Sequence, residues 1–345
     1  MARRYKIGVI WGDGIGPEVV SAALETLSYL NPNLEFVDLE AGYEYYKKRG
    51  KPIEDNFFDK VREIDAILKG PLHTPLDDKE FKSVNVLIRR ELGLYANVRP
   101  FKSFKGISTK KFNFVIVREN TEDVYVGIEG LHGDYAVALR IISRQSTEKV
   151  VRLAIDIARL RGFSRVTVVH KANILKLTDG LFREVFYSIV SGYSDVTPGE
   201  LIVDAAAYVM VKNPENLQVL VMPNLYGDIL SDLAAGMVGS LGLCGSAQIG
   251  DTVAVFEPVH GTAPDIAGRG VANPLGEITA AKMMLEYLSK KYSDEVLSRQ
   301  AFVLERAIDI LIEDRRILTP DLGGNKGTRD VVTVLKDVIG EIHTK

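Results

Sequence analysis

Cysteine is almost absent from this chain of 345 residues, which carries a single one, Cys244. One thiol excludes an internal disulfide and any zinc site built from cysteines. The five histidines form no H-x-x-x-H pair, so the sequence offers no histidine-type zinc site either. Long apolar runs are also missing, since none approaches the ~20 residues of a membrane-spanning helix. The apolar stretch after the charged N-terminus is interrupted at Asp13, which predicts a buried strand and not a signal peptide.

An excess of one charge sign is missing as well. Lys and Arg number 43 and Asp and Glu number 46, which gives a net charge of −3. Nucleic-acid binders normally carry a strong basic excess, so this near balance argues against that class. Hydrophobic residues at 46% and charged residues at 26% are typical of a folded globular chain and exclude disorder. The length suggests two domains or one large unit.

Apolar segments of strand length alternate with helical patterns along the chain. This alternation predicts an α/β fold with a largely parallel sheet and helices on both faces. The expected strands are residues 5–11, 34–39, 66–68, 112–117, 166–169 and 217–222. The expected helices are residues 17–30, 57–63, 148–160, 178–188, 228–237, 277–292, 301–313 and 331–342. The class that remains is a cytoplasmic α/β protein, and enzymes dominate that class.

Three segments between these elements have patterns of their own. Residues 12–18 carry glycines as G-x-G-x-G and not as the dinucleotide fingerprint G-x-G-x-x-G, which favours a tight strand-to-helix turn. Residues 239–250 are rich in glycine and small side chains, which predicts a loop beside a site. Residues 125–142 predict a hairpin that turns at 131–134, and an ordinary surface hairpin is favoured over a projecting arm.

Three arginines stand near the ends of expected elements. Asn85 and Arg89 share one face of an expected helix that follows Ser83, which could be only an N-cap. Arg99 and Arg118 each follow a strand-like run, at the edge where α/β proteins place ligands. Arginine forks bind carboxylates through paired hydrogen bonds. The set predicts a pocket for a substrate with several carboxylates.

Acidic residues gather in a second place. Asp228 and Asp232 stand four residues apart at the start of an expected helix, and Asp204 ends the apolar strand 201–203. Acids that balance a helix dipole would explain Asp228 well and Asp232 less well. Adjacent carboxylates repel each other unless a cation lies between them, and oxygen ligands suit Mg²⁺ or Mn²⁺. The pattern therefore predicts a site for a hard divalent ion.

Six stretches resemble the β-decarboxylating dehydrogenases, the family of isocitrate, homoisocitrate and 3-isopropylmalate dehydrogenases. They are residues 12–18, 117–123, 170–173, 224–232, 257–268 and 319–324, in the family's order. The resemblance implies a non-Rossmann α/β fold of two domains that share a large, mostly parallel twisted sheet. The large cofactor-binding domain would comprise residues 1–99 and 250–345, and the small domain residues 100–249. The implied reaction oxidises a 2-hydroxy acid by hydride transfer to NAD(P) and then releases the β-carboxylate as CO₂.

The same resemblance implies a homodimer with shared active sites. Asp228 and Asp232 would bind Mg²⁺ or Mn²⁺ together with Asp204 of the partner subunit. Lys171 of the partner subunit would take the proton of the substrate hydroxyl, and Tyr125 would return a proton to the enol carbon after CO₂ leaves. Without the resemblance, Lys171 would be a solvated charge and Tyr125 an ordinary hairpin aromatic.

The cofactor expectation depends on Asp265 and Ile266, a pair that resembles the NAD-using members of the family. A carboxylate accepts hydrogen bonds from the ribose hydroxyls of NAD and repels the 2′-phosphate of NADP. The remaining implied cofactor residues are Thr74, Glu257, His260, Gly261, Thr262, Ala263 and Asn273.

Substrate choice is expected to depend on Ser83 and Asn85. Isocitrate-type members carry S-x-N-x-x-x-R here, whose polar groups can reach a third carboxylate, whereas isopropylmalate-type members carry apolar side chains. Residues 69–72 and 222–225 also resemble NAD-linked isocitrate dehydrogenase, but residues 95–100 are shared with homoisocitrate enzymes. We expect NAD-dependent conversion of isocitrate to 2-oxoglutarate and CO₂, with homoisocitrate as the alternative, because one methylene changes binding by only ~1–3 kcal/mol. 3-Isopropylmalate and a non-catalytic regulatory subunit are less favoured.

Overall fold

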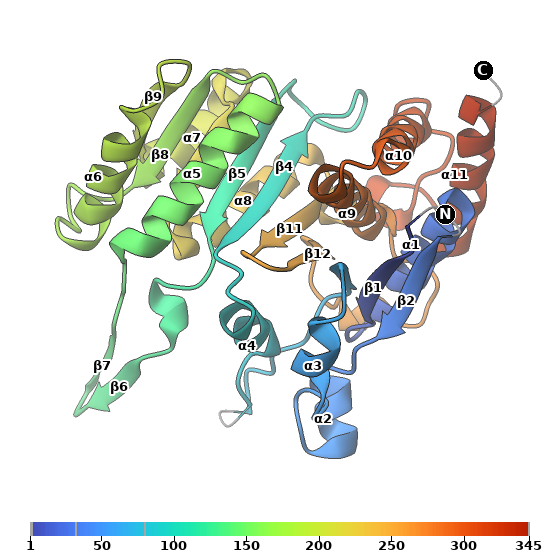
Figure 1. Ribbon diagram of the computed structural model, residues 1–345, viewed down its shortest axis with the longest axis horizontal. Helices are drawn as coiled ribbons and strands as arrows, with labels where there is room; N and C mark the ends of the chain where they lie inside the picture. Colours follow the sequence, from blue (N-terminus) through green and yellow to red (C-terminus); the bar gives the residue numbers. More distant parts are fainter. Residues whose placement is uncertain (1–2, 32, 79–80, 344–345) are drawn as a thin grey trace.

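The computed structural model describes residues 3–31, 33–78 and 81–343, in which helices pack on both faces of one large sheet (Figure 1). The strand order of this ten-stranded sheet is β2-β1-β3-β12-β11-β4-β5-β10-β8-β9. Its strands are β1 (Tyr5–Ile10), β2 (Leu34–Asp38), β3 (Ala66–Lys69), β4 (Ala96–Lys102), β5 (Asn113–Glu119), β8 (Arg165–His170), β9 (Thr197–Ile202), β10 (Val219–Met222), β11 (Gly245–Ile249) and β12 (Ala254–Pro258). The expected α/β class and its mostly parallel sheet are confirmed.

Antiparallel pairing is confined to the middle of the sheet. The strands β4 and β5, β4 and β11, and β11 and β12 pair antiparallel, whereas the outer neighbours pair parallel. In the centre Val98 of β4 lies between Val117 of β5 and Ala247 of β11. The helices are α1 (Gly16–Leu30), α2 (Tyr43–Arg49), α3 (Phe57–Val61), α4 (Val84–Glu91), α5 (Arg144–Leu160), α6 (Thr178–Val190), α7 (Val203–Lys212), α8 (Asn224–Val238), α9 (Leu275–Tyr292), α10 (Glu295–Glu313) and α11 (Thr328–His343).

The helices α5 and α8 cover opposite faces of the central strands (Figure 1). Helix α5 begins at Ser143, whose hydroxyl accepts a hydrogen bond from Ser146 N at 3.1 Å. Val150, Val151 and Ile155 then recur on one face and are buried against the sheet. Burying each such side chain contributes about 1.5–3 kcal/mol, so this face and not local propensity holds the helix in place. None of the helices in the described part of the chain is long and apolar enough to cross a membrane.

The glycine-rich segment after β1 is the expected strand-to-helix turn. Gly12 and Gly14 have φ values of 79° and 60°, and a Cβ atom on Gly14 would lie 2.1 Å from the carbonyl oxygen of Thr262. Ile15 N donates to the same carbonyl oxygen at 2.9 Å. The turn therefore fixes the segment around Thr262 against the start of α1.

Three sequence expectations about local structure are wrong. Residues 239–250 are not one loop, because they include the buried strand β11. Their small side chains have a packing reason, since a Cβ atom on Gly245 would lie 2.5 Å from Ala280 N of α9. Asp204 lies in the first turn of α7 and not at the end of a strand. Arg99 and Arg118 lie within β4 and β5 and not after them.

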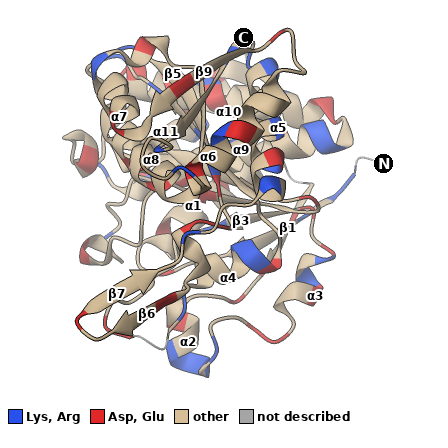
Figure 2. Cartoon of the chain, turned by 90° about the vertical axis from the view of Figure 1, so that its left-hand side faces the viewer, with Lys and Arg blue, Asp and Glu red and all other residues tan. Residues whose placement is uncertain are grey.

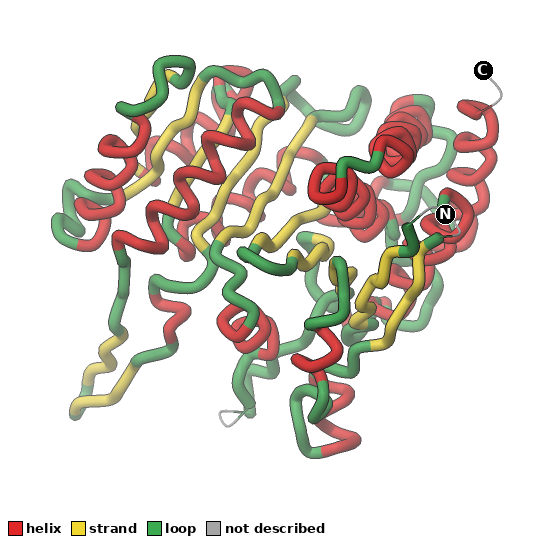
Figure 3. Tube along the Cα trace, viewed as in Figure 1, coloured by secondary structure: helices red, strands yellow, loops and turns green. Residues whose placement is uncertain are grey.

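The expected hairpin forms from β6 (Glu129–His132) and β7 (Tyr135–Ala138), but it is not an ordinary surface hairpin. It projects from the body as an arm (Figures 1 and 2), and every residue of β7 is exposed. On one side a short helix, η1 (Val124–Val126), precedes it, and on the other side a loop leads to α5 (Figure 3). The alternation of side chains predicted that these two strands pair with each other. Whether the hairpin packs on the body or projects from it depends on tertiary structure.

Candidate active site

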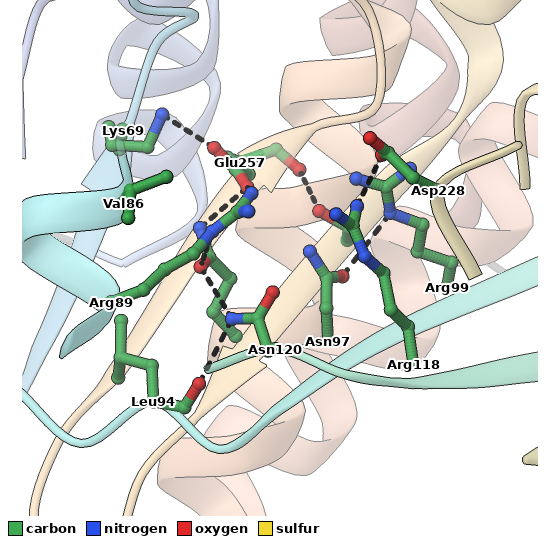
Figure 4. A network of polar contacts seen from close by, with 12 residues as sticks. Lys69, Val86, Arg89, Leu94, Asn97, Arg99, Arg118, Asn120, Asp228 and Glu257 are labelled. Carbon is green, nitrogen blue, oxygen red and sulfur yellow. Dashed lines mark hydrogen bonds and ion pairs between the residues drawn. The ribbon is translucent and has the colours of Figure 1, made fainter. Parts of the chain in front are cut away.

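Three arginines converge where the central strands meet α4. Arg99 extends from β4, Arg118 from β5 and Arg89 from α4, and all three are buried (Figure 4). Burial and the nearby charge of Arg118 lower the pKa of Arg89 to about 10. The same two causes lower the pKa of Arg99. Three cations in a poorly solvated place repel each other, so the cluster favours the binding of anions.

Neutral side chains from distant segments fix the orientation of each guanidinium. Nε of Arg89 donates to Gln248 Oε1 at 2.8 Å, and Nη1 of Arg99 donates to Ser231 Oγ at 2.6 Å. Nε of Arg118 donates to Asn224 Oδ1 at 2.8 Å. Its Nη2 is buried and has no hydrogen-bond partner among the described residues. Because buried donors are normally paired, this nitrogen indicates a position for an anionic ligand. The sequence did not predict Gln248, Ser231 or Asn224 as partners of these arginines, because each lies more than 100 residues away from its arginine.

Asp228 is already engaged within the chain. Its carboxylate accepts hydrogen bonds from Nη1 of Arg118 and from the hydroxyl of Tyr125. Burial alone would raise the pKa of Asp228, but Arg118 and Tyr125 outweigh it and lower the pKa. Burial and the bond to Asp228 raise the pKa of Tyr125 to about 12. Tyr125 therefore keeps its proton at neutral pH and can donate it.

Asp232 lies one turn further along α8 and is more open. Its side chain is 64% exposed, and its Oδ1 is 3.8 Å from Nη1 of Arg99. Burial, and to a smaller extent the charge of Asp228, raise the pKa of Asp232. Within one chain the cations nearest this acid pair are Arg99 and Arg118. Two carboxylates on one helix face, one of them accessible, are a donor set that suits Mg²⁺ or Mn²⁺.

Lys171 and Asp204 form a separate ion pair. Nζ of Lys171 donates to Asp204 Oδ1, and this bond lowers the pKa of Asp204. In residues 3–31, 33–78 and 81–343 no three His, Cys, Asp or Glu side chains gather as metal ligands. One chain therefore brings Asp228 and Asp232 together but does not add Asp204 to them.

Glu257 of β12, an expected cofactor residue, contacts both Lys69 and Arg89. Its Oε2 is 2.5 Å from Nζ of Lys69, and its Oε1 accepts from Nε2 of Gln248 at 2.6 Å and lies 3.8 Å from Nη2 of Arg89 (Figure 4). Burial would raise the pKa of Glu257, but Lys69 and Arg89 lower it. Asn120 also donates to Gln248 Oε1, at 3.0 Å. A continuous polar network therefore joins Lys69 to Arg89.

The other expected cofactor residues lie on the segments next to this network. Thr262 lines a cavity of about 310 Å³ together with His73, the neighbour of Thr74. Burial lowers the pKa of His260, whose Nε2 is buried without a partner in the described chain. The remaining positions follow: Gly261, Ala263 with φ 37°, Asp265 and Ile266 in the short helix η4 (Pro264–Ile266), and Asn273, which donates to Asp321 Oδ2 at 3.0 Å.

Helix α4 borders the arginines with its N-terminal turn. Ser83 is the N-cap, since its hydroxyl accepts from Val86 N at 3.5 Å. It also lines a cavity of about 540 Å³ with Tyr125, and a second cavity of about 240 Å³ is lined by Tyr125 and Arg89. Oδ1 of Asn85 is buried and has no partner among the described residues. One cavity is thus lined by the polar start of α4 and the other by the buried Arg89, and Tyr125 lines both.

A family model described as isocitrate/isopropylmalate dehydrogenase matches residues 6–336. The chain belongs to this family. It is therefore an enzyme of this dehydrogenase class, as the sequence motifs indicate. The homoisocitrate dehydrogenase of Methanocaldococcus jannaschii is 40% identical and is matched over 94% of this chain and 95% of its own length. The isocitrate/homoisocitrate dehydrogenase of Thermus thermophilus is 45% identical, over 94% of this chain and 95% of that protein.

Solved structures of the family share the fold. The isocitrate dehydrogenase of Methylococcus capsulatus superposes with a TM-score of 0.92 at 42% identity, covering 97% of this chain and 99% of that one. A β-decarboxylating dehydrogenase of Thermococcus kodakarensis gives 0.85 at 37% identity, covering 99% and 97%. These proteins carry different substrate names, so family membership by itself does not select the substrate.

Proposed function

We propose that this enzyme catalyses the NAD-dependent oxidative decarboxylation of a tricarboxylic 2-hydroxy acid of the isocitrate type. The observation that carries the proposal is the buried cluster of Arg89, Arg99 and Arg118, in which Arg89 lines a cavity and Nη2 of Arg118 has no partner among the described residues. Three guanidinium groups match three carboxylates in charge, and their fixed orientation lowers the entropy cost of binding.

Two acids of this type are candidates for the main substrate. Ser83 and Asn85 at the start of α4 favour isocitrate, because polar side chains here can contact a third carboxylate. The names of the related proteins give more weight to homoisocitrate, which is longer by one methylene. An isopropyl group would leave polar groups of this pocket unpaired, so 3-isopropylmalate is less favoured despite a 43% identical relative of that name in Methanothermobacter thermautotrophicus.

Asp228 and Asp232 would hold Mg²⁺ or Mn²⁺, with Asp204 of the partner subunit as a third ligand. Such an ion polarises the C–O bond of the substrate and stabilises the enolate charge. The chain's own residues move the protons. Tyr125, with its pKa of about 12, holds the proton that the enol carbon receives. Lys171 of the partner subunit would take the hydroxyl proton at the start.

A homodimer is supported by two exposed apolar surfaces. Leu131 on the arm is 80% exposed, and Leu177, which follows Lys171 in the chain, is 87% exposed. Ile174, Tyr208 and Ile229, which lie within four residues of Lys171, Asp204 and Asp228 in the sequence, are also exposed. Apolar surface of this extent is typical of an interface, and a two-fold axis would carry the Lys171–Asp204 pair of one chain to the arginines of the other.

The order of strands in the sheet supports the proposed domains, whose first boundary lies within β4. Strands β1, β2, β3 and β12, from residues 1–99 and 250–345, lie on one side, and β5, β8, β9 and β10, from residues 100–249, lie on the other. Strands β4 and β11 join the two sides. The proposed cofactor segments then belong to the large domain and the metal-binding helix α8 to the small one.

The direct test is to measure NADH and NADPH formation with isocitrate, homoisocitrate and 3-isopropylmalate in the presence of Mg²⁺. We expect NAD to be preferred and the two tricarboxylates to be used with a higher kcat/KM than 3-isopropylmalate. The order of the first two identifies the main substrate. Absence of turnover on all three acids would refute the proposed function.

Shared active sites are tested by mixing two inactive variants, Lys171→Met and Tyr125→Phe. In a mixed dimer the chain with Met at position 171 retains its own Tyr125 and receives Lys171 of the partner subunit, so one site works. Random mixing should restore about a quarter of the wild-type activity, because half of the dimers are mixed and each has one intact site. A chain that carries both substitutions should restore nothing.

A further inference from the structure

Two buried carboxylates share a single guanidinium at the base of the arm. Asp123 and Asp179 have no exposed surface, and both lie against Arg140. Nε of Arg140 is 2.8 Å from Asp123 Oδ1, and its Nη1 is 3.2 Å from Asp179 Oδ1. The three residues come from the two ends of the arm and from the first turn of α6. We call them the arm-base cluster.

The arm-base cluster contacts both ends of the arm. Asp123 N donates to Ile141 O at 2.8 Å, which pairs the chain entering the arm with the chain leaving it. Asp123 has a backbone φ of 69°, which is uncommon for a residue other than glycine. Tyr125, the proposed proton donor, lies two residues after Asp123. The position of the cluster therefore also fixes the position of Tyr125.

A second contact connects the cluster to helix α8. Oδ2 of Asp123 accepts from Leu225 N at 2.9 Å, in the first turn of the helix. Nη1 of Arg140 donates to the hydroxyl of Tyr226 at 2.7 Å. Asp228 extends from the next turn of the same helix, so the cluster fixes the start of the element that carries it.

The third contact reaches Lys171. Oδ2 of Asp179 accepts from the backbone nitrogen of Lys171 at 2.6 Å, while Oδ1 faces Arg140. Lys171 stands directly after β8, beyond the last residue pair of β8 and β9, and among the described residues its amide donates to Asp179. The carboxylate of Asp179 is therefore a buried side-chain anchor for the segment that presents the Lys171 ammonium.

Stability alone is a poor reason for this arrangement. Two anions and one cation are buried together, and the desolvation cost of buried charges often exceeds their mutual attraction. The second oxygen of each carboxylate instead accepts a hydrogen bond from a backbone N–H, and that N–H belongs to a segment that carries a proposed site residue. Buried polar groups of this kind define geometry more than they add stability.

We propose that Asp179, held in place by Arg140, is a positioning residue for Lys171, through the hydrogen bond that the Lys171 backbone N–H donates to the Asp179 carboxylate. This inference rests on the proposed function, in which Lys171 of one chain acts in the active site of the other. It goes further in one respect: Asp179 controls the active site of the neighbouring subunit and not the site of its own chain. A residue that only supports the fold would affect both sites alike.

Mixed dimers separate the two cases, with the chains purified through two different affinity tags. The variant is Asp179→Ala, which leaves Arg140 and Asp123 as a balanced pair. In the first dimer it is combined with a Tyr125→Phe chain. The one working site belongs to the Asp179→Ala chain and receives an intact Lys171 segment. In the second dimer it is combined with a Lys171→Met chain, and the one working site receives the Lys171 that has lost its anchor.

We expect the first dimer to match the reference dimer of Lys171→Met and Tyr125→Phe chains. The second dimer should have a kcat at least tenfold lower, with the KM of the substrate changed less than about twofold, because Lys171 moves the proton and does not bind the carboxylates. Asp179→Asn keeps an acceptor oxygen for the Lys171 amide and should restore part of the loss.

The matched control is Glu184→Gln on the same helix, which removes an exposed ion pair with Arg144 and should leave both dimers unchanged. Equal activities of the two dimers, whether both normal or both reduced, would overturn the role of Asp179. An inactive reference dimer would instead refute the shared sites of the proposed function. If Asp179→Ala does not fold, the same comparison with Asp179→Asn decides the question, since the second dimer must still be the slower one.

Discussion

Removal of the Lys69 ammonium group should destabilise the protein strongly at neutral pH and much less in acid. The side chains of Lys69 and Glu257 are only 1% and 8% exposed, and the two charged atoms are 2.5 Å apart. In Lys69→Met, Glu257 keeps its bond to Gln248, but its nearest remaining cation is Arg89 at 3.8 Å. Removing one partner of a buried ion pair costs about 3–5 kcal/mol.

The pH dependence follows from the Glu257 carboxyl. In the wild type Lys69 is the largest of the charges that hold the pKa of Glu257 below its usual 4.5, against the opposing effect of burial. A carboxyl with a lowered pKa in the folded state contributes stability above that usual value and loses the contribution as the pH falls. In Lys69→Met burial dominates and the pKa of Glu257 rises. A protonated Glu257 needs no cation, so the difference between variant and wild type should shrink as the pH falls.

The assay is guanidinium-induced unfolding followed by circular dichroism, near pH 7.5 and near pH 5. Lys69→Met, Glu257→Gln and the double variant form a cycle, and the double variant should regain part of the loss because the buried Glu257 charge that lost Lys69 is gone, although Arg89 then lacks Glu257. Lys51→Met, which removes an exposed partner of Asp55, is the control and should change little. Equal unfolding midpoints for Lys69→Met and the control at pH 7.5 would refute the reasoning, as would a deficit that grows in acid.

Three further substitutions test the cofactor, the proton donor and the start of α4. Asp265→Lys combined with Ile266→Tyr should shift the ratio of kcat/KM for NAD and NADP toward NADP, and an unchanged ratio would remove Asp265 from the ribose site. Tyr125→Phe should lower kcat by about 10²–10⁴ while the KM of the substrate changes little, and the wild type should show no loss from tyrosine ionisation below about pH 10, because the pKa of Tyr125 is about 12. Ser83→Ala should cost about 0.5–2 kcal/mol of stability through the lost N-cap. The same change should reduce the preference for tricarboxylates over 3-isopropylmalate, and an unaltered preference would show that Ser83 acts only as a cap.

Local sequence patterns determined the parts of this protein that depend on neighbours along the chain. The alternation of strand and helix periods specified the α/β class, because burial of one face is recorded every two or every three to four residues. The turn at residues 12–18 was predictable from its glycines, since Gly12 and Gly14 adopt positive φ values that other residues rarely adopt. The types of the site residues were also readable: arginines and aspartates in this order are typical of an anionic substrate and a hard metal ion.

Only the tertiary structure decided which of these residues meet and what they meet. Gln248 contacts Arg89 across 159 positions of sequence, and Asn224 contacts Arg118 across 106, so no local pattern records either pair. The segment that contains β11 was predicted as a loop because its residues are small, but they are small because α9 packs against them. The arm was predicted as an ordinary surface hairpin because a local pattern does not record whether a hairpin packs on the body or projects from it. Asp228 was expected to bind a metal ion, and within the chain its carboxylate accepts hydrogen bonds from Arg118 and Tyr125. Contacts of this kind arise when strands and helices from distant parts of the chain pack together. The sequence pattern records the propensity and the buried face of each element, but not the partners that folding brings to it.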